Sequence, residues 1–427
     1  MVDVKRHLLA ISWAMPPLVY PRAIQVSRSL KELSRRGWAI DVIALDAGSN
    51  PGGTRDALFA DCYSKFYQLN SIDIQDIHRM AARHWKIRGF LERRFAQFNP
   101  SDWAWKRRAR SKAVDLIKLK HPQALITFAQ PWVDHLIGLS IKHRFPSLPW
   151  VAHFSDPWTD GPYAKSGNPE LLGEWRLQER KVIEAADEVV FVNDRTAHLV
   201  MSKYPAAWRR KVCSVPHGLD PELLEFISPR ARQSERPRLV YTGSMFEGLR
   251  DPTQVLKAIS CLKSMIPWER MPIIEFVGSG GAQYGKCSKE LGIEELVRFS
   301  ERTTYLEALQ IASESDVLLL IDTNMENSVF LPSKVADYLM LGKPIFALAP
   351  RNGATTDILR PLGHTCIDSN DPSVIARALA DILSMQVPSS VGVRQPRIAP
   401  AHDYHISNTT DRLEAAINAA ICREALH

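Results

Sequence analysis

The sequence predicts an α/β protein built from two doubly wound parallel-sheet domains in series. Its 427 residues exceed what one hydrophobic core usually supports. Short apolar runs alternate with stretches of helical periodicity, a pattern typical of parallel strands covered by helices on both faces. The alternation stops at a polar, proline-bearing stretch and then restarts. We therefore expect domains at 1–226 and 238–405, joined by a linker at 227–237.

The first domain opens with an apolar strand at Leu8–Trp13. A helix follows, because apolar residues recur at three- and four-residue intervals until two cations and a glycine end it at Arg35–Gly37. Further strands are expected at Ala39–Leu45, Ala124–Phe128, Trp150–Phe154, Glu188–Val192 and Val212–Val215.

The second domain repeats the alternation. Its strands are expected at Leu239–Thr242, Ile273–Val277, Val317–Ile321 and Pro344–Leu348. A final amphipathic pattern predicts a helix within 406–427 that can pack back on the first domain. Two such domains are expected to face each other across a cleft, and open parallel sheets bind ligands beyond the carboxyl ends of their strands.

The basic charge is concentrated in one segment. Residues 78–120 carry thirteen Lys and Arg against three acidic residues, whereas the whole chain has a net charge of +7. Within it, apolar residues between Ile87 and Phe98 fall at helical spacing with cations interleaved. Two interpretations stay open: a basic helix lying on an anionic membrane surface, or a helix whose apolar face packs on the first domain. Nucleic acid fits less well, because the rest of the chain is net acidic.

Composition favours a cytoplasmic protein. The six cysteines are scattered without a CxxC pair, as expected of reduced thiols and not of a disulfide framework or zinc site. No apolar run approaches the ~20 residues of a membrane span. The apolar run Leu8–Met15 is short and ends on two prolines, which favours a buried first strand over a signal peptide.

The most informative motif is FLPSKVADYLMLGKPI, at Phe330–Ile345. Ser333 can cap a helix that Gly342 and Pro344 end. Lys334 in the first turn would add its charge to the helix N-terminus and so favour a diphosphate group. Asp337 lies one turn further on the same face and could accept hydrogen bonds from ribose hydroxyls. A solvated Lys–Asp pair is the plain alternative.

Two further loops follow strands of the second domain. In YTGSMFEGLRDP, a glycine-bearing loop with Gly243 and Ser244 leads to Arg250, whose guanidinium can grip a phosphate with two hydrogen bonds. In FVGSG, a tight turn after a strand would lie near a nucleotide; its residues are Gly278, Ser279 and Gly280. The GxxxxGK pattern that begins at Gly280 is not expected to be an ATPase loop, because Cys287 stands where magnesium binding needs a hydroxyl.

The first domain offers HFSDPWTDGPY, directly after a strand. A carboxylate at Asp156, beside His153, could orient or deprotonate a hydroxyl, although Asp156 could equally cap the turn at Pro157. No D-x-D and no clustered metal ligands occur in the sequence. We therefore expect neither a metal nor a bound cofactor.

Together these stretches resemble the GT-B glycosyltransferases of family 4, of the bacterial polysaccharide-assembly type, along almost the whole chain. The resemblance rests on the proline-rich first loop, on Gly243-Ser244, on Arg250-Asp251-Pro252, on Phe276–Gly280 and on Pro332–Tyr338. It implies a retaining, metal-independent sugar transfer, with Arg250 and Lys334 as diphosphate ligands. It also makes Asp337 the ribose acceptor and places Asp156 on the acceptor side and the nucleobase near Gly278–Gly280.

The chain departs from the family pattern at three places. Val329 stands where a glutamate usually precedes the ribose acid, and Ser155 where relatives often have arginine. The first loop has Val19, Tyr20 and Pro21 in place of glycines, which leaves Arg22 as the polar group expected there.

The expected function is transfer of a sugar from a UDP-, GDP- or dTDP-sugar to a glycan or a polyprenyl-diphosphate-linked glycan, in bacterial surface or exopolysaccharide synthesis. The expected location is the cytoplasm or the inner face of the plasma membrane. Two alternatives stay open: a nucleotide-sugar epimerase, which needs no acceptor, and a nucleotide-binding protein without catalysis. A nicotinamide oxidoreductase is disfavoured because no GxGxxG follows the first strand.

Overall fold

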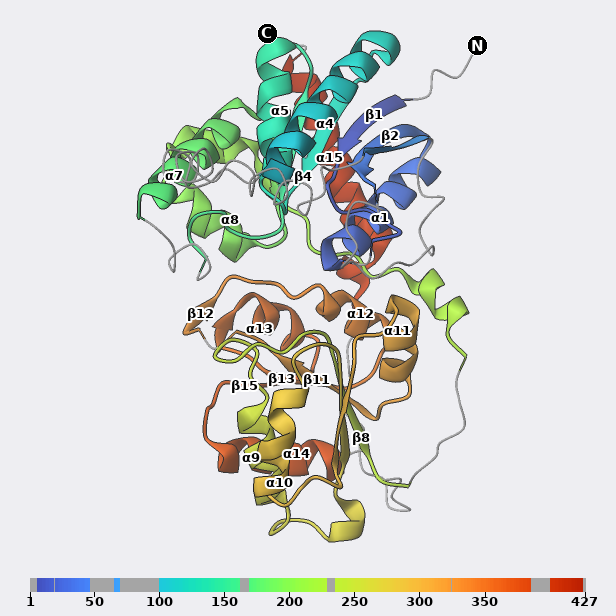
Figure 1. The fold of residues 1–427 in the computed structure, drawn as a ribbon, viewed down its shortest axis with the longest axis vertical. Helices are drawn as coiled ribbons and strands as arrows, with labels where there is room; N and C mark the ends of the chain where they lie inside the picture. Colours follow the sequence, from blue (N-terminus) through green and yellow to red (C-terminus); the bar gives the residue numbers. More distant parts are fainter. Residues whose placement is uncertain are drawn as a thin grey trace, which may run out of the picture. The chain divides into compact units, whose positions relative to one another are not determined.

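A computed structural model shows two compact units, which Figure 1 draws as a ribbon. One comprises Met1–Gly218 together with Ile406–His427, and the other Leu219–His405. The structure describes residues 6–18, 20–46, 65–69, 100–161, 169–228, 235–323, 325–384 and 400–424.

A seven-stranded parallel sheet forms the centre of the first unit, in the order β3-β2-β1-β4-β5-β6-β7. Its strands are β1 (Arg6–Ile11), β2 (Trp38–Leu45), β3 (Lys65–Leu69), β4 (Ala124–Phe128), β5 (Trp150–Phe154), β6 (Glu188–Phe191) and β7 (Val212–Ser214). β4, β5 and β6 are buried along their whole length, because helices cover both faces.

Successive residues of β1 show the two faces of this sheet. Leu9 and Ile11 pack into a core beneath α4 (Pro100–Lys120), α5 (Val133–Arg144), α7 (Pro169–Ala185) and α8 (Asp194–Met201). Leu8 and Ala10 pack into a second core with α1 (Pro21–Arg35) and α15 (Ile406–Glu424). The alternation follows from the two-residue period of a strand.

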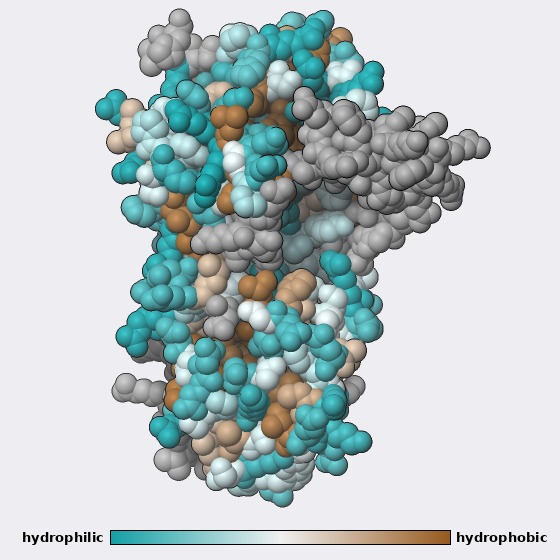
Figure 2. All heavy atoms as spheres, turned by 60° about the vertical axis from the view of Figure 1, so that its left-hand side comes forward, coloured by the Kyte–Doolittle hydropathy of each residue, from teal (hydrophilic) through white to brown (hydrophobic). Residues whose placement is uncertain are grey.

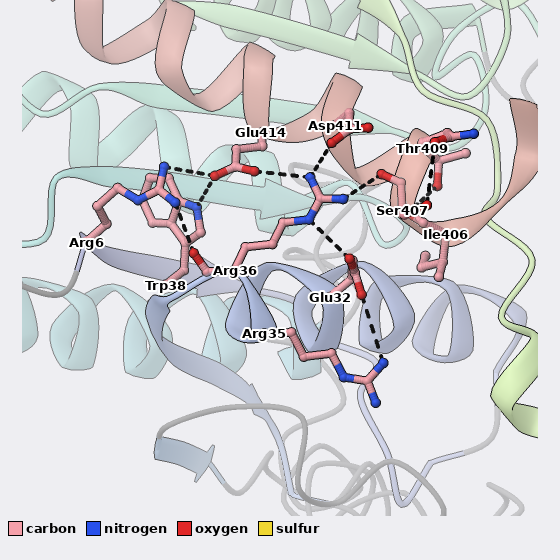
Figure 3. A network of polar contacts seen from close by, with 11 residues as sticks. Arg6, Glu32, Arg35, Arg36, Trp38, Ile406, Ser407, Thr409, Asp411 and Glu414 are labelled. Carbon is pink, nitrogen blue, oxygen red and sulfur yellow. Dashed lines mark hydrogen bonds and ion pairs between the residues drawn. The ribbon is translucent and has the colours of Figure 1, made fainter.

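The last helix, α15, is fastened to the first unit by an apolar face and a polar network. Leu413 and Ile417 are fully buried in the core shared with α1. Arg36, after the end of α1, donates to Asp411 at 2.5 Å, to Glu414 at 3.2 Å and to the Ser407 carbonyl at 2.7 Å (Figure 3). The Arg36 side chain thus joins three positions along α15 and orients that helix against α1.

Glu414 is the second centre of the same network. The indole of Trp38 donates to it at 2.9 Å, and Arg6 forms an ion pair with it at 2.8 Å (Figure 3). These donors lower the pKa of the Glu414 carboxyl, although its partial burial opposes them.

The second unit repeats the architecture with six parallel strands in the order β10-β9-β8-β11-β13-β15. They are β8 (Arg238–Thr242), β9 (Ile273–Val277), β10 (Val297–Ser300), β11 (Val317–Ile321), β13 (Ile345–Leu348) and β15 (Thr365–Ile367). The helices of this unit are α9 (Thr253–Leu262), α10 (Gly285–Glu290), α11 (Tyr305–Ser313), α12 (Lys334–Met340), α13 (Ala354–Leu359) and α14 (Pro372–Ser384). A separate two-stranded sheet pairs β12 (Asn327–Ser328) with β14 (Asn352–Gly353).

In each sheet the strand order reverses direction beside the first strand, at β1/β4 and at β8/β11. Ligands of doubly wound sheets bind outside the carboxyl ends of the strands at such reversals. The loops that follow β8 and its neighbours are therefore the natural place for a ligand in the second unit.

The fold class agrees with the prediction of two doubly wound parallel-sheet domains. The expected limits of β4, β5, β9 and β11 match those observed, and the other expected strands differ by one or two residues. The first unit ends at Gly218 and not at 226, because Leu219 donates to the Tyr404 carbonyl at 2.8 Å and pairs with His405 of the second unit. The helix expected between Ile87 and Phe98 lies outside the described residues.

Hydrophilic side chains dominate the described surface in Figure 2, and hydrophobic side chains form small separate patches between them. Within the described part of the chain, no helix is long and apolar enough to cross a membrane.

The packing of α15 predicts that Ile417→Ala will destabilise the first unit by about 2–5 kcal/mol, the usual cost of emptying a buried site. Asn418→Ala, on the exposed side of the same helix, should change stability by less than about 0.5 kcal/mol. Urea unfolding followed by tryptophan fluorescence measures the stability of the first unit. Of the eleven tryptophans in the sequence, only Trp268 lies between 219 and 405, so the signal comes mainly from the first unit. Equal effects of the two substitutions would contradict the packing.

Candidate functional site

Two glycine-bearing loops meet at the carboxyl ends of β8 and β9. Gly243 donates its N–H to the Val277 carbonyl at 2.7 Å, and the Ser279 hydroxyl donates to the Ser244 hydroxyl at 2.7 Å. A Cβ on Gly278 would lie 2.2 Å from the Gly243 carbonyl oxygen. Both glycines also have positive φ, +120° and +146°, which side chains disfavour. The close contact of the two loops therefore requires glycine at both positions.

Gly280, two residues after Gly278, also lies too close to the neighbouring loop to carry a Cβ. A Cβ there would lie 2.5 Å from the Met245 carbonyl oxygen. The Met245 N–H donates to the Ser279 carbonyl at 2.9 Å, so the loops stay paired beyond the strands. The structure thus brings together the five loop residues that the sequence selected: Gly243, Ser244, Gly278, Ser279 and Gly280.

Lys334 is buried against this glycine loop. Its Nζ lies 3.7 Å from the centroid of the Tyr241 ring, and a Cβ on Gly243 would lie 2.8 Å from it. The ring face attracts the ammonium, yet Nζ has no hydrogen-bond partner. Burial, and then the charge of Arg250, lower the pKa of Lys334 well below its usual range.

Arg250 supplies the second cation. Its loop is closed by backbone hydrogen bonds with Phe246, at 2.9 and 3.2 Å, and its Nε is buried without a partner. Arg250 and Lys334 are near enough for the first to shift the pKa of the second. Two cations near each other, each with an unpaired buried nitrogen, form a site that a doubly charged anion such as a diphosphate would stabilise.

The helix that carries Lys334 differs from the prediction at its start. Ser333 has a helical φ of −57° and makes no side-chain capping bond, so the predicted capping role is wrong. The position of α12 depends instead on Tyr338, whose hydroxyl accepts from the Thr242 N–H at 2.9 Å. That contact holds the helix against the end of β8. Asp337, one turn further along α12, accepts a hydrogen bond from the Tyr305 hydroxyl at 2.8 Å.

Sequence reasoning missed Asp322, which follows β11 directly. Its carboxylate accepts from the Thr355 hydroxyl and from the Thr323 N–H, both at 2.7 Å. Burial raises its pKa, and these hydrogen bonds and the charge of Arg250 act in the opposite direction. The available signal was a carboxylate at the end of a strand of five apolar residues, but its partner Thr355 lies 33 residues further along the chain.

Arg22, His153 and Asp156 form a second cluster, in the first unit. Arg22 donates to the His153 carbonyl at 3.0 Å, and its Nη2 lies 2.9 Å from Nδ1 of the same histidine. Burial lowers the pKa of Arg22 to about 10, although Asp156 and Asp134 raise it. Burial, and then the charge of Arg22, lower the pKa of His153 well below its usual value. The neutral imidazole can therefore accept a hydrogen bond from Arg22 through Nδ1.

Asp156 lies at the carboxyl end of β5. Its Oδ2 accepts from the Gln130 side chain at 3.2 Å and from the Ser155 hydroxyl at 3.3 Å. Ser155, which replaces the arginine of the family pattern, also donates to the Ala129 carbonyl at 3.0 Å. Two neutral donors thus contact this carboxylate at the carboxyl end of β5.

Asp134, which the sequence analysis did not select, fastens the loop after β1. It accepts from the Trp13 N–H at 2.6 Å and from the Trp105 indole at 2.7 Å. Burial raises the pKa of Asp134 to about 7 despite these two bonds. Beside it, Trp132 stacks on Trp158 with the ring centroids 5.2 Å apart.

The unpaired ammonium predicts that Lys334→Met will stabilise the ligand-free protein, by roughly 1–3 kcal/mol, because a buried polar group without a partner is removed. The folded pKa of Lys334 is lowered, so its destabilising effect grows as pH falls from the unfolded pKa toward the folded one. The gain should therefore shrink at strongly alkaline pH. Calorimetric unfolding of Lys334→Met beside Lys343→Met measures it, and a loss of stability in Lys334→Met alone would refute the assignment.

No protein-family model matches the chain, and no curated protein matches it in sequence. Solved structures match along their whole length. A glycosyltransferase from Rickettsia africae ESF-5 has a TM-score of 0.65 at 11% identity, covering 97% of this chain and 99% of its own. A lipopolysaccharide outer core galactosyltransferase has a TM-score of 0.58 at 14% identity, with coverage of 97% and 99%. A putative UDP-N-acetylglucosamine 2-epimerase from Listeria monocytogenes has a TM-score of 0.60 at 11% identity, with coverage of 98% for both. The two parallel sheets and this full-length similarity show that the chain has the GT-B fold.

Proposed function

We propose that the chain is a retaining, metal-independent glycosyltransferase that moves a sugar from a nucleotide-sugar donor to a glycan or a polyprenyl-diphosphate-linked glycan. The observation that carries the proposal is the pair of cations, Lys334 and Arg250, beside the glycine loops of β8 and β9. The similarity of the whole chain to a glycosyltransferase and to a galactosyltransferase supports this reading of the site. No bound cofactor belongs to the proposal, since the nucleotide sugar is itself a substrate.

The proposed donor site uses the second unit. Lys334 and Arg250 would bind the diphosphate, and Asp337 would accept a hydrogen bond from a ribose hydroxyl. Gly278–Gly280 would lie against the nucleobase. When the bond between the anomeric carbon and the diphosphate oxygen breaks, negative charge grows on the leaving group. Fixed cations in a dry site stabilise that charge more than water does.

The proposed acceptor side uses the cluster of the first unit. Asp156 would accept a hydrogen bond from the attacking hydroxyl and so orient it, or take its proton. His153, neutral and fixed by Arg22, would position the substrate without adding charge. The partly exposed Trp132, which stacks on the buried Trp158, offers an aromatic side chain close to β4 and β5.

The proposed setting is assembly of a bacterial surface or exopolysaccharide at the inner face of the plasma membrane. The similarity to a lipopolysaccharide galactosyltransferase and the basic segment at 78–120 support this setting. An epimerase is the second candidate, because a putative epimerase shares the fold along its whole length. An epimerase would convert the nucleotide sugar without acceptor, whereas a transferase releases nucleoside diphosphate in proportion to the acceptor used.

Lys334→Ala should lower nucleotide-sugar turnover at least about tenfold, because a charge-assisted hydrogen bond to phosphate is worth roughly 1.5–3 kcal/mol. Release of nucleoside diphosphate in the presence of acceptor is the measurement, and Lys343→Ala, three residues beyond the same helix, is the control. Since the ligand-free fold does not need the Lys334 charge, circular dichroism should show both variants folded. Wild-type turnover in folded Lys334→Ala would remove Lys334 from the site.

Turnover should persist in excess EDTA, because two side-chain cations would neutralise the leaving diphosphate. The described residues contain no cluster of three or more His, Cys, Asp or Glu side chains that could hold a metal ion. The assay is run with and without chelator at fixed substrate concentration. Complete loss of turnover that magnesium or manganese restores would show that the leaving-group assignment is wrong.

A further inference from the structure

The helices α4 and α5 lie side by side on the first unit (Figure 1). Side chains of both helices line an open groove. One hollow of this groove has a volume of about 640 Å³, and an adjoining one of about 400 Å³ shares four of its lining residues. The shared residues are Lys106, Arg110, Ser140 and Arg144. The groove is thus one continuous feature to which both helices contribute.

Helical periodicity explains why cations gather in this groove. Trp105, Ala109 and Ala113 face the core of the first unit. The opposite face of α4 carries Trp103, Lys106, Arg107, Arg110 and Ser111, at spacings of three and four residues. From α5, Ser140, His143 and Arg144 line the same hollows.

Cations dominate the lining of this groove. Among the residues that the structure describes, no acidic side chain lines either hollow, and Lys106, Arg110 and Arg144 form no ion pair. Partial burial, and then the nearby charge of Arg110, lower the pKa of Lys106. Cations that line one hollow repel one another, and an anion bound between them would relieve this repulsion.

The other lining groups indicate what kind of anion fits. Ser111 and Ser140 add hydroxyl donors, and the guanidinium groups match the tetrahedral oxygens of phosphate. Leu136, Leu139 and Val114 form an apolar wall, and Trp103, 49% exposed, lies at the margin. A phosphate ester with an apolar body satisfies both parts of the groove.

We propose that the α4–α5 groove is a binding site for a phosphate or diphosphate group attached to an apolar molecule. It shares no residue with the donor and acceptor clusters described above, so it does not depend on the proposed transfer activity. Two sources offer this chemistry: the headgroup of an anionic phospholipid and a diphosphate ester free in solution.

The first experiment titrates inorganic diphosphate into the full chain by calorimetry at low salt, on a Lys334→Ala background that weakens the proposed donor site. Arg110→Glu from α4 and Arg144→Glu from α5 should each weaken the remaining binding about tenfold or more. Lys118→Glu makes the same charge change on an exposed position of α4 outside the groove and should weaken it less than about twofold. An equal loss in Lys118→Glu would show general surface charge in place of a site and overturn the proposal.

The second experiment keeps the wild-type chain, so it does not depend on any variant folding. Diphosphate should slow hydrogen exchange in peptides from α4 and α5. Any change in peptides covering 243–251 is followed separately. Sedimentation of the protein with phosphatidylglycerol vesicles is then compared with sedimentation with pure phosphatidylcholine vesicles. This comparison distinguishes a phospholipid headgroup from a soluble diphosphate ester as the ligand. Vesicle binding that free diphosphate displaces and Arg110→Glu removes supports a lipid headgroup, and diphosphate binding without vesicle binding supports a soluble ester. Absence of both refutes the site, while nucleotide-sugar turnover would remain an independent test of the transferase.

Discussion

The candidate donor site depends on one unfavourable feature, a lysine ammonium buried without a hydrogen-bond acceptor. An unpaired buried polar group costs about 1–3 kcal/mol, more when it is charged. The surroundings of Lys334 reduce this cost only in part. Tyr241 offers its ring face at 3.7 Å, and Asp322 and Asp337 contribute opposite charge from a distance. Gly243 is glycine because a Cβ would press on the same ammonium.

Lys334 differs from buried charges that have their hydrogen-bond partners in place. Glu179 is fully buried, yet it accepts from the Thr159 N–H at 3.1 Å, from the Tyr204 hydroxyl at 2.6 Å and from Lys203. That network stabilises the first unit and leaves no capacity for a ligand. A buried group with its partners in place indicates architecture, whereas a buried cation without them indicates the place of an absent anion.

The parts of the fold that could be predicted are strands whose burial produces an apolar run in the local sequence. β4, β5 and β11 are buried along their whole length, so each appears in the sequence as a largely apolar run whose ends are the strand ends. β9 was found in the same way, although Glu275 within it is partly exposed. β3, β10 and β15 were not predicted. They lie at or near sheet edges and are partly exposed, so polar residues interrupt their pattern.

The candidate site divides in the same way. Glycines and cations of the strand-following loops could be selected from the sequence, because each loop carries its own signal. Asp322 and Asp134 could not, because each depends on a hydrogen-bond partner far along the chain, Thr355 for Asp322 and Trp13 for Asp134. Ser333 shows the opposite failure: a residue type that suits a cap stands at a position whose backbone is already helical.

The basic segment shows how a structure can sharpen a composition argument. Counted along the sequence, 78–120 is a run of positive charge that would suit any anionic surface. In α4, Trp105, Ala109 and Ala113 face the core, so the cations share the outer face, as in any surface helix. This periodicity alone would account for cations that only face solvent. What distinguishes these cations is α5, which adds Arg144 and a serine hydroxyl to the same hollow, while none of the described carboxylates lines it. Attraction to a flat anionic surface needs only net charge, whereas two helices converging on one hollow create a preference for a compact anion of defined shape.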